Sequence, residues 1–444
     1  MPNQRRINQG KGVSRLAVAT LIAIASLLLI DHGTATAQLS VLHDFSSSEY
    51  YLNGFEPEGR LVMDGKTGTL FGVTSEGGDE VCDGDPEDPG YFGCGGVFAL
   101  GNNPKGVPTV FGRIHDFTAT GHDGNAPYTA LERDARGNLY GTAPYGGNYA
   151  CAGDYGCGAV FEEIAPTDGG AWTEKLLHLF AGGKDGAYPG SALLLGPAGV
   201  LYGTTCAGGP AFSGTAFSLT PKGGSYLYAV IHAFDGGPNG GCPEGQFAID
   251  KSGNLYGTAA LGGKRGFGVV FELKPGKAGW TETVLHSFAG EPHDGESPES
   301  GLVFDSSGNL FGATPYGGAN GDGMVYELSL VGTTWTETVL HNFNGSDGES
   351  PSGDKLAIDR IGDLFGTTED GGTHGDGTIF ELTNSAGSYT FASLYSFCVL
   401  ANCADGAYPY GGVIIDATGN LYGTTAAGGT ANAGTAYIFK QQDH

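Results

Sequence analysis

Basic residues are scarce in this chain of 444 residues. Lys and Arg together number 21 against 48 Asp and Glu, which gives a formal net charge of −27 at pH 7. Proteins that bind nucleic acid present a basic surface to the phosphates, so this composition argues against DNA or RNA as a partner. Beyond residue 30, no apolar run approaches the roughly 20 residues that a membrane-spanning helix needs. We therefore expect no transmembrane segment in the mature protein.

Familiar catalytic motifs are also missing. The chain has no Gly-x-Ser-x-Gly elbow, no His-Glu-x-x-His, no Walker loop and no paired Cys-x-x-Cys zinc set. Gly-Asp-Gly at Gly321 and Gly375 lacks the acidic ladder and the closing Glu of a calcium loop. We predict no catalytic residue and no cofactor, while the acidic composition leaves calcium open as a ligand and any metal site unassigned.

The first 37 residues have the three parts of a secretory signal. A basic start is followed by the mostly apolar stretch Leu16 to Ile30 and by the small residues Ala35-Thr36-Ala37. This order is typical of a signal peptide that is cleaved before Gln38. We predict a signal peptide over residues 1–37 and one mature domain over residues 38–444. The mature protein is then secreted, either outside the cell, in the periplasm or at the cell surface.

One tetrapeptide recurs through the rest of the chain. Leu139-Tyr140-Gly141-Thr142 returns with small changes at Leu201, Leu255, Leu310, Leu364 and Leu421, after a weaker copy at Leu70. Neighbouring copies lie 54 to 69 residues apart, a spacing that indicates an array of one supersecondary unit. The chain is expected to hold seven such units.

Each unit carries four short apolar segments separated by turn residues. In the cleanest copy these are residues 283–288, 301–305, 310–314 and 324–328. Short segments rich in Val, Phe, Tyr and Thr and bounded by Gly, Pro, Asn and Asp are typical of β-strands. The Asp-x-x-Gly-Asn sequence between the second and third segments predicts a tight hairpin. We predict an all-β fold, a seven-bladed β-propeller of four-stranded antiparallel blades.

The two ends of the array suggest how the ring closes. The predicted mature chain begins with a segment of the first kind, residues 39–45, and the last unit ends with a segment of the fourth kind, residues 435–439. If the strand after Asp-Gly-x-x-Pro is innermost, the last blade lacks its outer strand. The N-terminal strand is then expected to complete that blade.

The repeat resembles a known family. Gly-Asn-Leu-Tyr-Gly-Thr-Thr, a Gly pair, Gly-Thr-Val-Phe-Glu-Leu and Leu-His-x-Phe are similar to the GloVer tandem repeat of exported bacterial proteins with a choice of surface anchors, over about residues 39 to 440. The resemblance implies a secreted, propeller-like array and brings no catalytic residues to carry over. Only five residues follow Phe439, without a sorting tail, so anchoring is not expected for this chain.

Several tempting residues belong to the repeat. One position holds His43, His115, His178, His232, His286 and His341, with Tyr395 in the remaining unit. Trp172, Trp280 and Trp335 likewise share one position. Residues that recur at a fixed place in every unit are best interpreted as packing between strands.

Departures from the repeat point to one face of the ring. The Asp-Gly-x-x-Pro loops and the Gly-pair loops should share this face, and the Gly-pair loops of the first two units are enlarged. Such insertions often mark a binding face. The candidate ligand-face residues are His122, Asp123, Asp185, His293, Asp294, Asp347, His374, Asp376 and Asp405. As an alternative, the Asp residues form turns and the His residues are merely exposed in loops.

The eight cysteines all lie in or beside loops of that face. An even number in an exported chain predicts disulfides, although eight cysteines allow 105 pairings. Three pairs are close in sequence, namely Cys82 with Cys94, Cys151 with Cys157 and Cys398 with Cys403. The remaining pair, Cys206 with Cys242, is expected to staple the third unit to the fourth.

Three functions remain open at this point. We favour a secreted, monomeric protein that binds an extracellular glycan, another cell-surface polymer or a protein through the loop face and is not an enzyme. The alternatives are a glycoside hydrolase or polysaccharide lyase with carboxylates in the central channel, and a structural scaffold. Two carboxyl groups about 5 to 9 Å apart in a deep pocket would favour hydrolysis.

Overall fold

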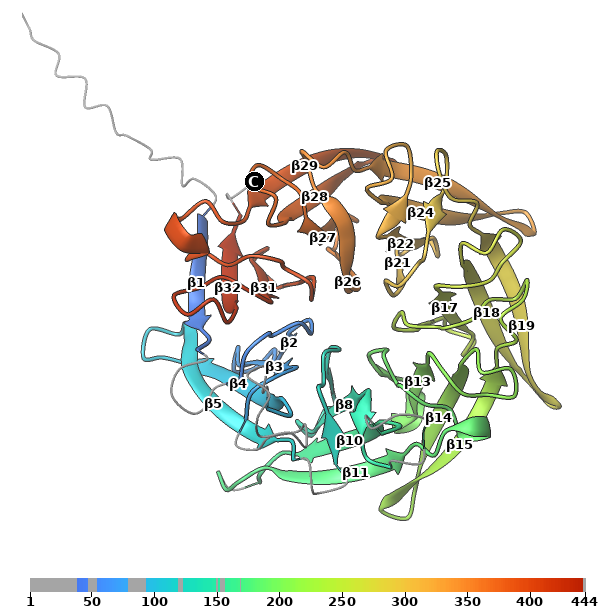
Figure 1. Cartoon of the computed structure of the whole chain (residues 1–444), viewed down its shortest axis with the longest axis horizontal. Coiled ribbons are helices and arrows are strands. Elements are labelled where there is room, and N and C mark those ends of the chain that lie inside the picture. Colours follow the sequence, from blue (N-terminus) through green and yellow to red (C-terminus); the bar gives the residue numbers. More distant parts are fainter. Residues whose placement is uncertain are drawn as a thin grey trace, which may run out of the picture. The chain divides into compact units, whose positions relative to one another are not determined.

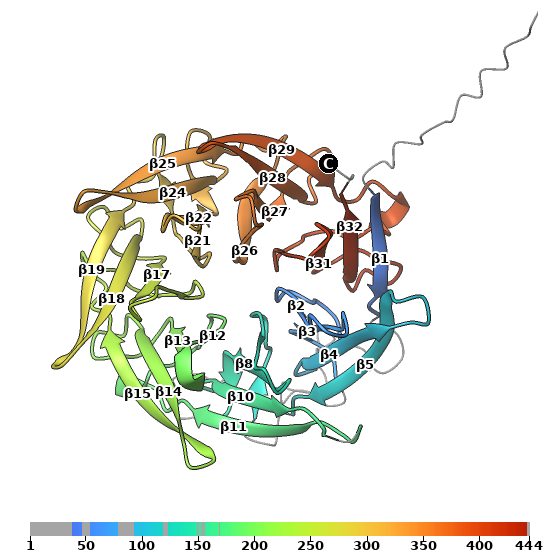
Figure 2. The ribbon, with the colours of Figure 1, turned by 180° about the vertical axis from the view of Figure 1, so that it is seen from behind.

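The computed structural model describes residues 38–46, 54–78, 93–118, 123–148, 151, 156–167 and 169–441. These residues form seven sheets in a ring, each of four antiparallel strands, and the predicted seven-bladed propeller is confirmed (Figure 1). Seen from behind, the ring keeps one strand of each blade beside the central channel and another at the rim (Figure 2). We number the blades in chain order, with β2 to β5 in blade 1 and β30 to β32 in blade 7.

Each blade has an innermost, a second, a third and an outer strand, in order from the channel to the rim. The innermost strands are β2 (Val62–Met63), β7 (Glu132–Arg133), β12 (Leu194–Leu195), β16 (Ala248–Ile249), β21 (Val303–Phe304), β26 (Glu349–Ile358) and β30 (Val413–Ile415). The second strands carry the recurring tetrapeptide and are β3 (Leu70–Thr74), β8 (Leu139–Ala143), β13 (Leu201–Thr205), β17 (Leu255–Ala259), β22 (Leu310–Thr314), β27 (Leu364–Asp370) and β31 (Leu421–Thr425). The third strands are β4 (Gly96–Asn102), β10 (Ala159–Ile164), β14 (Thr215–Lys222), β18 (Val269–Gly276), β24 (Met324–Val331), β28 (Thr378–Ser385) and β32 (Thr435–Lys440).

The outer strands follow the rim. They are β5 (Pro108–Asp116), β11 (Thr173–Leu179), β15 (Ser225–Ala233), β19 (Gly279–Ser287), β25 (Thr334–Asn342), β29 (Ser388–Ser396) and β1 (Gln38–Asp44). The smaller elements are the strand pairs β6 (Gly124–Asn125) with β9 (Tyr145–Gly146) and β20 (Gly295–Glu296) with β23 (Tyr316–Gly317), and the 3-10 turns η1 (Gly183–Asp185), η2 (Pro197–Gly199) and η3 (Ala401–Cys403). Within the described residues, no helix has the length and apolar character needed to cross a membrane.

Blade 7 is completed by the N-terminal strand, as predicted. β1 pairs antiparallel with β32, from Gln38 opposite Lys440 to Asp44 opposite Thr435. Beyond the strand, the Phe45 N–H donates to the Gly434 carbonyl at 3.1 Å, and the Phe45 side chain is fully buried. The first described residues and the last blade therefore close the ring together.

The recurring tetrapeptide is fixed by close packing inside each blade. Gly141 lies directly under the ring of Phe161 on the neighbouring strand, and a Cβ at Gly141 would come within 2.4 Å of the ring. Gly203 and Gly366 meet the rings of their own neighbouring strands in the same way. Real Cβ atoms do not approach so closely, so this position requires glycine, and the third residue of the tetrapeptide is structural.

The repeated His and Trp residues pack between blades, as expected. The His178 ring stacks on Tyr228 of the next blade with 3.7 Å between centroids, and His341 stacks on Phe391 at the same distance. Each Trp meets an aromatic ring of the preceding blade edge-on, as Trp335 does with Tyr256 at 6.1 Å. These rings are partly buried between blades, where they serve packing and are not a ligand platform.

Three of the predicted disulfides are confirmed. They join Cys151 to Cys157, Cys206 to Cys242 and Cys398 to Cys403. Cys94 is disulfide-bonded, whereas Cys82 and most of the two enlarged loops lie outside the described residues. The Cys206–Cys242 bond links blades 3 and 4, so the expected staple between neighbouring blades is present.

Candidate functional site

In each blade, the chain leads into the innermost strand through an unusual backbone turn. The residue before the recurring Pro has a positive φ in all seven blades, for example 54° at Glu56, 53° at Ala126 and 58° at Tyr408. A non-glycine residue in this region costs about 1–2 kcal/mol. The same residue donates its N–H to a carbonyl of the preceding blade, as Ala126 does to Cys94 at 3.0 Å. Because this turn occurs in all seven blades, it belongs to the repeat architecture. The turn also sets the direction of the residue after the Pro.

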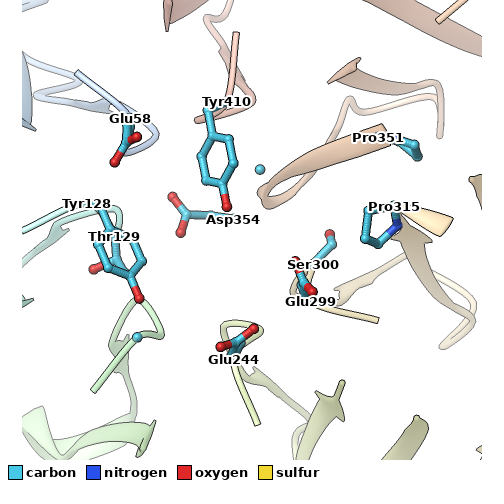
Figure 3. Close-up of a pocket in the computed structure, with 12 residues that line it drawn as sticks. Glu58, Tyr128, Thr129, Glu244, Glu299, Ser300, Pro315, Pro351, Asp354 and Tyr410 are labelled. Carbon is cyan, nitrogen blue, oxygen red and sulfur yellow. The ribbon is translucent and has the colours of Figure 1, made fainter. Parts of the chain in front are cut away.

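The residues after the recurring Pro converge on the channel. In blades 1 to 5 and 7 they are Glu58, Tyr128, Gly190, Glu244, Glu299 and Tyr410, and all six line one cavity of about 150 Å³. Figure 3 shows three carboxyl groups and two phenol groups, from different blades, arranged around a common space. We call this cavity the central cup, and Glu58, Tyr128, Glu244, Glu299 and Tyr410 its wall residues.

The floor of the central cup comes from an insertion in blade 6. Five residue positions separate Pro351 from Leu356, whereas four separate the corresponding Pro and apolar residue in the other blades. The register of β26 against β27 shifts at this point. Asp354 thereby crosses the channel, and its carboxylate accepts hydrogen bonds from the backbone N–H groups of Arg60 in blade 1 and Ala130 in blade 2, at 3.1 and 3.0 Å.

Buried charges surround this floor. Burial raises the pKa of Asp354 and lowers the pKa of Lys355 to about 8, with the positive charge of Arg60 lowering it further. Glu132 of blade 2 accepts a hydrogen bond from Gln246 of blade 4 at 2.9 Å, and burial raises its pKa. Charged and polar groups from four blades thus meet below the central cup.

Burial raises the pKa of all three wall carboxyls, and brings those of Glu58 and Glu244 close to neutrality. Burial raises the pKa of Glu58 to about 7, helped by the negative charges of Glu56 and Glu369. Burial and the Glu299 carboxylate raise the pKa of Glu244 to about 7. Burial also raises the pKa of Tyr128 and Tyr410 above the ordinary value. At pH 7 the central cup therefore offers carboxylates, carboxylic acids and phenols together, so it holds both donors and acceptors.

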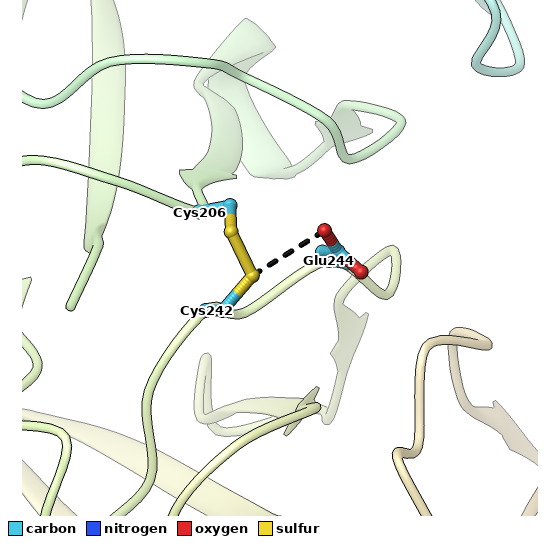
Figure 4. Close-up of side chains that lie close together, drawn as sticks. All are labelled: Cys206, Cys242 and Glu244. Atoms are coloured by element: carbon cyan, nitrogen blue, oxygen red, sulfur yellow. Dashed lines mark hydrogen bonds between the residues drawn. A yellow bond between two sulfur atoms is a disulfide. The ribbon is translucent and has the colours of Figure 1, made fainter.

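The staple between blades 3 and 4 touches the central cup. The Cys242 Sγ lies 3.3 Å from Glu244 Oε1 (Figure 4). A disulfide sulfur carries no hydrogen and is a weak acceptor, so this contact is a hydrogen bond only when the Glu244 carboxyl is protonated and donates. The Cys206–Cys242 bond therefore helps to orient a wall residue.

The structure gives most of the predicted ligand-face aspartates a contact with the repeat. Asp185, Asp294 and Asp347 lie 3.1 to 3.2 Å from the ring nitrogens of the repeat His residues of their units, and Asp405 accepts a hydrogen bond from Tyr395 at 2.8 Å. Asp123 accepts the Thr118 N–H at 3.2 Å. Each carboxylate ties its loop to the end of the preceding outer strand.

The other four predicted ligand-face residues are not among these aspartates that contact the repeat. His293 and His374 are exposed, Asp376 is partly buried, and His122 lies outside the described residues. None of the eight candidates that the structure describes is among the residues that line the central cup. The wall residues went unnoticed in the sequence, although a signal exists: the position after the recurring Pro varies between units and is Glu in three of them.

The wall glutamates should make folding stability depend on pH. Because the pKa of Glu244 is raised to about 7 in the folded state, the folded protein binds more protons than the unfolded chain between about pH 4.5 and pH 7. The free energy of unfolding should therefore fall as pH rises through this window. Glu244→Gln should gain stability relative to the wild type between pH 5 and pH 8, on the order of 1–2 kcal/mol. Urea unfolding at both pH values measures this, and Glu291→Gln, at an exposed glutamate, should track the wild type. A constant difference between Glu244→Gln and the wild type would contradict the prediction.

The chain is similar in sequence to one repeat family and in fold to several solved structures. Residues 87–305 and 277–444 match the sequence model described as the Gloeobacter/Verrucomicrobia repeat. A protein from Bacteroides fragilis, titled "putative 6-phosphogluconolactonase", is 13% identical with a TM-score of 0.49, covering 81% of this chain and 94% of that chain. A luciferin-regenerating enzyme is 13% identical with a TM-score of 0.42, covering 91% of this chain and 95% of that chain. No curated protein matches the sequence.

Proposed function

The chain belongs to the Gloeobacter/Verrucomicrobia repeat family, and we propose that it is an exported propeller that binds the end of a neutral, hydroxyl-rich polymer such as a glycan in its central cup. The observation that carries this proposal is the convergence of three glutamates and two tyrosines from five blades on one cavity. The three disulfides between described cysteines support an oxidising compartment.

The chemistry of the wall suits hydroxyl groups. An ionised carboxyl accepts hydrogen bonds, whereas a protonated carboxyl or a phenol also donates them, and a sugar hydroxyl needs both kinds of partner. Glu58 and Glu244, each with a pKa raised to about 7, supply both forms near neutral pH. A polyanion would be repelled by these carboxyls once they ionise, so a neutral polymer is favoured over an acidic one.

The size of the cavity favours a chain end. Pockets that enclose a whole drug-sized ligand usually measure about 300–1,000 Å³, and the central cup measures about 150 Å³. Asp354 closes it from below, so a polymer cannot thread through the channel. A single terminal residue enters the central cup, and the rest of the ligand lies over the loop face.

Titration calorimetry with neutral glucose-, xylose- and mannose-based oligosaccharides tests this proposal. We expect at least one of them to bind, with the affinity falling about tenfold or more in Glu244→Gln, because a buried polar contact to a ligand is worth about 1–3 kcal/mol. Glu291→Gln, on the loop face but not among the residues that line the central cup, should bind like the wild type. Equal weakening in both variants would move the site to the loops, and no binding by any of these sugars would favour the scaffold function.

Hydrolysis is the second candidate because of the same raised pKa values. A carboxyl that is still protonated near pH 7 can act as a general acid beside an ionised partner, and both Glu58 and Glu244 meet this condition. Incubation of the same oligosaccharides with the protein, followed by an assay for new reducing ends, distinguishes the two functions. A glycoside hydrolase releases reducing ends in the wild type and not in Glu58→Gln or Glu244→Gln.

A further inference from the structure

Glu163 breaks the repeat in the core of blade 2. The third strand of every blade has one residue opposite the Leu of the recurring tetrapeptide, and Glu163 occupies this place opposite Leu139. In the other six blades the residue is apolar and buried: Leu100, Leu219, Leu273, Leu328, Leu382 and Phe439. Glu163 is just as buried, with no exposed surface. Nothing in the propeller architecture demands a carboxyl group here.

The Glu163 carboxyl has no hydrogen-bond partner. Neither of its oxygens makes a hydrogen bond within the described part of the chain, although a buried charge is strongly unfavourable unless it is paired. Its direct neighbour across β10 and β11 is a second acid, Glu174, whereas Leu273 and Leu328 face Glu282 and Glu337 at the same place in blades 4 and 5. Two like charges directly opposite each other destabilise a sheet. Among the described residues, the ion-pair partner of both acids is His115, which is positively charged only when it is protonated.

The gap between blades 1 and 2 brings a histidine to the two acids. Glu163 Oε1 lies 3.7 Å from Nδ1 of His115 on β5, and Glu174 Oε1 lies 3.8 Å from its Nε2. These separations exceed hydrogen-bond lengths, and the two carboxyls face different nitrogens of the ring. The 3.7 Å between Glu163 Oε1 and Nδ1 is near the distance of about 3.4 Å between neighbouring ligand atoms around a tetrahedral zinc ion. Glu174 reaches an ion on Nδ1 only if its side chain turns toward that side of the ring. One ligand atom from each of the three residues lies within 4.8 Å of the others.

We propose that His115, Glu163 and Glu174 bind a divalent transition-metal ion of the zinc class between blades 1 and 2. The ion supplies a positive charge that does not depend on protonation of His115, and it joins the outer strands of neighbouring blades. Asp123 Oδ2 lies 3.7 Å from His115 Nε2, where a carboxylate can hold the second ring nitrogen of a metal-bound histidine.

The ligand set selects the kind of ion. One imidazole with two carboxylates suits zinc or manganese, whereas calcium prefers six to eight oxygen ligands. The equivalent interface between blades 4 and 5 provides an internal contrast. There His286 Nε2 lies 3.2 Å from Asp294, and Leu328 takes the place of Glu163. That histidine is already paired with Asp294 within the protein, so an ion that bound His286, Asp294 and Glu337 would have to break this pair.

Titration of the chelator-treated protein, with its disulfides intact, tests the site. We expect ZnCl₂ to bind with one ion per chain in calorimetry and to raise the thermal midpoint by several degrees, while CaCl₂ does neither. Glu163→Leu restores the residue of the other blades, so it should fold and be at least as stable as the wild type without metal. Its zinc affinity should fall at least about 100-fold, since even partners behind the ligands contribute 10- to 100-fold.

Glu337→Gln is the matched control, because Glu337 is the equivalent of Glu174 at the interface between blades 4 and 5. This variant should keep wild-type zinc affinity. The proposal is overturned if the wild type binds no zinc, which would make Glu163 a buried acid that is simply protonated. Wild-type affinity in Glu163→Leu would also overturn it, as would equal loss in Glu163→Leu and Glu337→Gln. Binding of calcium as tight as that of zinc would reject the proposed ion class.

Discussion

Deletion of residues 38–46 should lower the free energy of unfolding by several kcal/mol and turn the protein into a species that self-associates. The deletion removes β1, which pairs along the length of β32, and with it the buried side chains of Leu42 and Phe45. Loss of a single buried Leu or Phe side chain costs about 2–5 kcal/mol. The unpaired edge of β32 would then be open to a second chain. Urea unfolding and size-exclusion chromatography measure the two effects.

Point variants separate closure of the ring from general damage. Phe45→Ala should account for about 3–5 kcal/mol by itself without exposing the β32 edge, so it should stay monomeric. Val41 on the same strand is 37% exposed, and Val41→Ala should change stability by less than about 1 kcal/mol. If the truncated protein unfolds at the same urea concentration as the wild type and remains monomeric, β1 does not close the ring.

The sequence was sufficient for the blades because local chemistry determines them. Asp305 accepts hydrogen bonds from the N–H groups of Ser307 and Asn309 at 2.8 Å, and this short-range turn recurs between the first two strands of several blades. The Gly of the tetrapeptide and the paired Cys206 and Cys242 are likewise fixed by contacts that follow from strand order. The sequence contains seven units, and the last unit lacks one strand. Closure of the ring by the N-terminal strand follows from these two observations.

The central cup could not be predicted in the same way. Glu58, Tyr128 and Glu244 lie far apart in the sequence and meet only because the residue before each recurring Pro adopts a positive φ. That conformation is expected for Gly, but the residues are Glu56, Ala126 and Cys242, so composition gives no sign of it. The backbone turn is imposed by hydrogen bonds between blades, which no single repeat contains.

The sequence also did not show that the loop aspartates contact the repeat histidines. Asp185 and His178 are seven residues apart and belong to different segments of the predicted unit, so the sequence suggested a loop residue and a packing residue with separate roles. The loop folds back on the end of β11 and brings them to 3.1 Å. Glu163, in contrast, could have been found from the sequence, because an alignment of the seven units places it in a column of Leu and Phe.

Replacement of Asp354 by Ala should be the most damaging single substitution in the channel, at about 3–5 kcal/mol, because it leaves buried cations without their partner. The Asp354 carboxylate lies beside Arg60 and Lys355, and it also accepts the N–H groups of two other blades. Its loss should lower the pKa of Lys355 further below about 8. Urea unfolding at pH 7 measures the loss of stability, and it should shrink at pH 9, where Lys355 is mostly neutral.

The nature of the loss can be separated with two further variants. Asp354→Asn keeps an oxygen that can accept the backbone N–H groups but removes the charge, so its effect should be intermediate. Combining Asp354→Ala with Lys355→Ala removes one of the unpaired cations. The loss of stability in the double variant should therefore be smaller than the sum of the losses in the two single variants. Strict additivity would mean that the two side chains do not interact, and the floor would then rest on the backbone hydrogen bonds of Asp354 alone. Since Asp354 is among the residues that line the central cup, its replacement should also weaken ligand binding, even though the wall residues are unchanged.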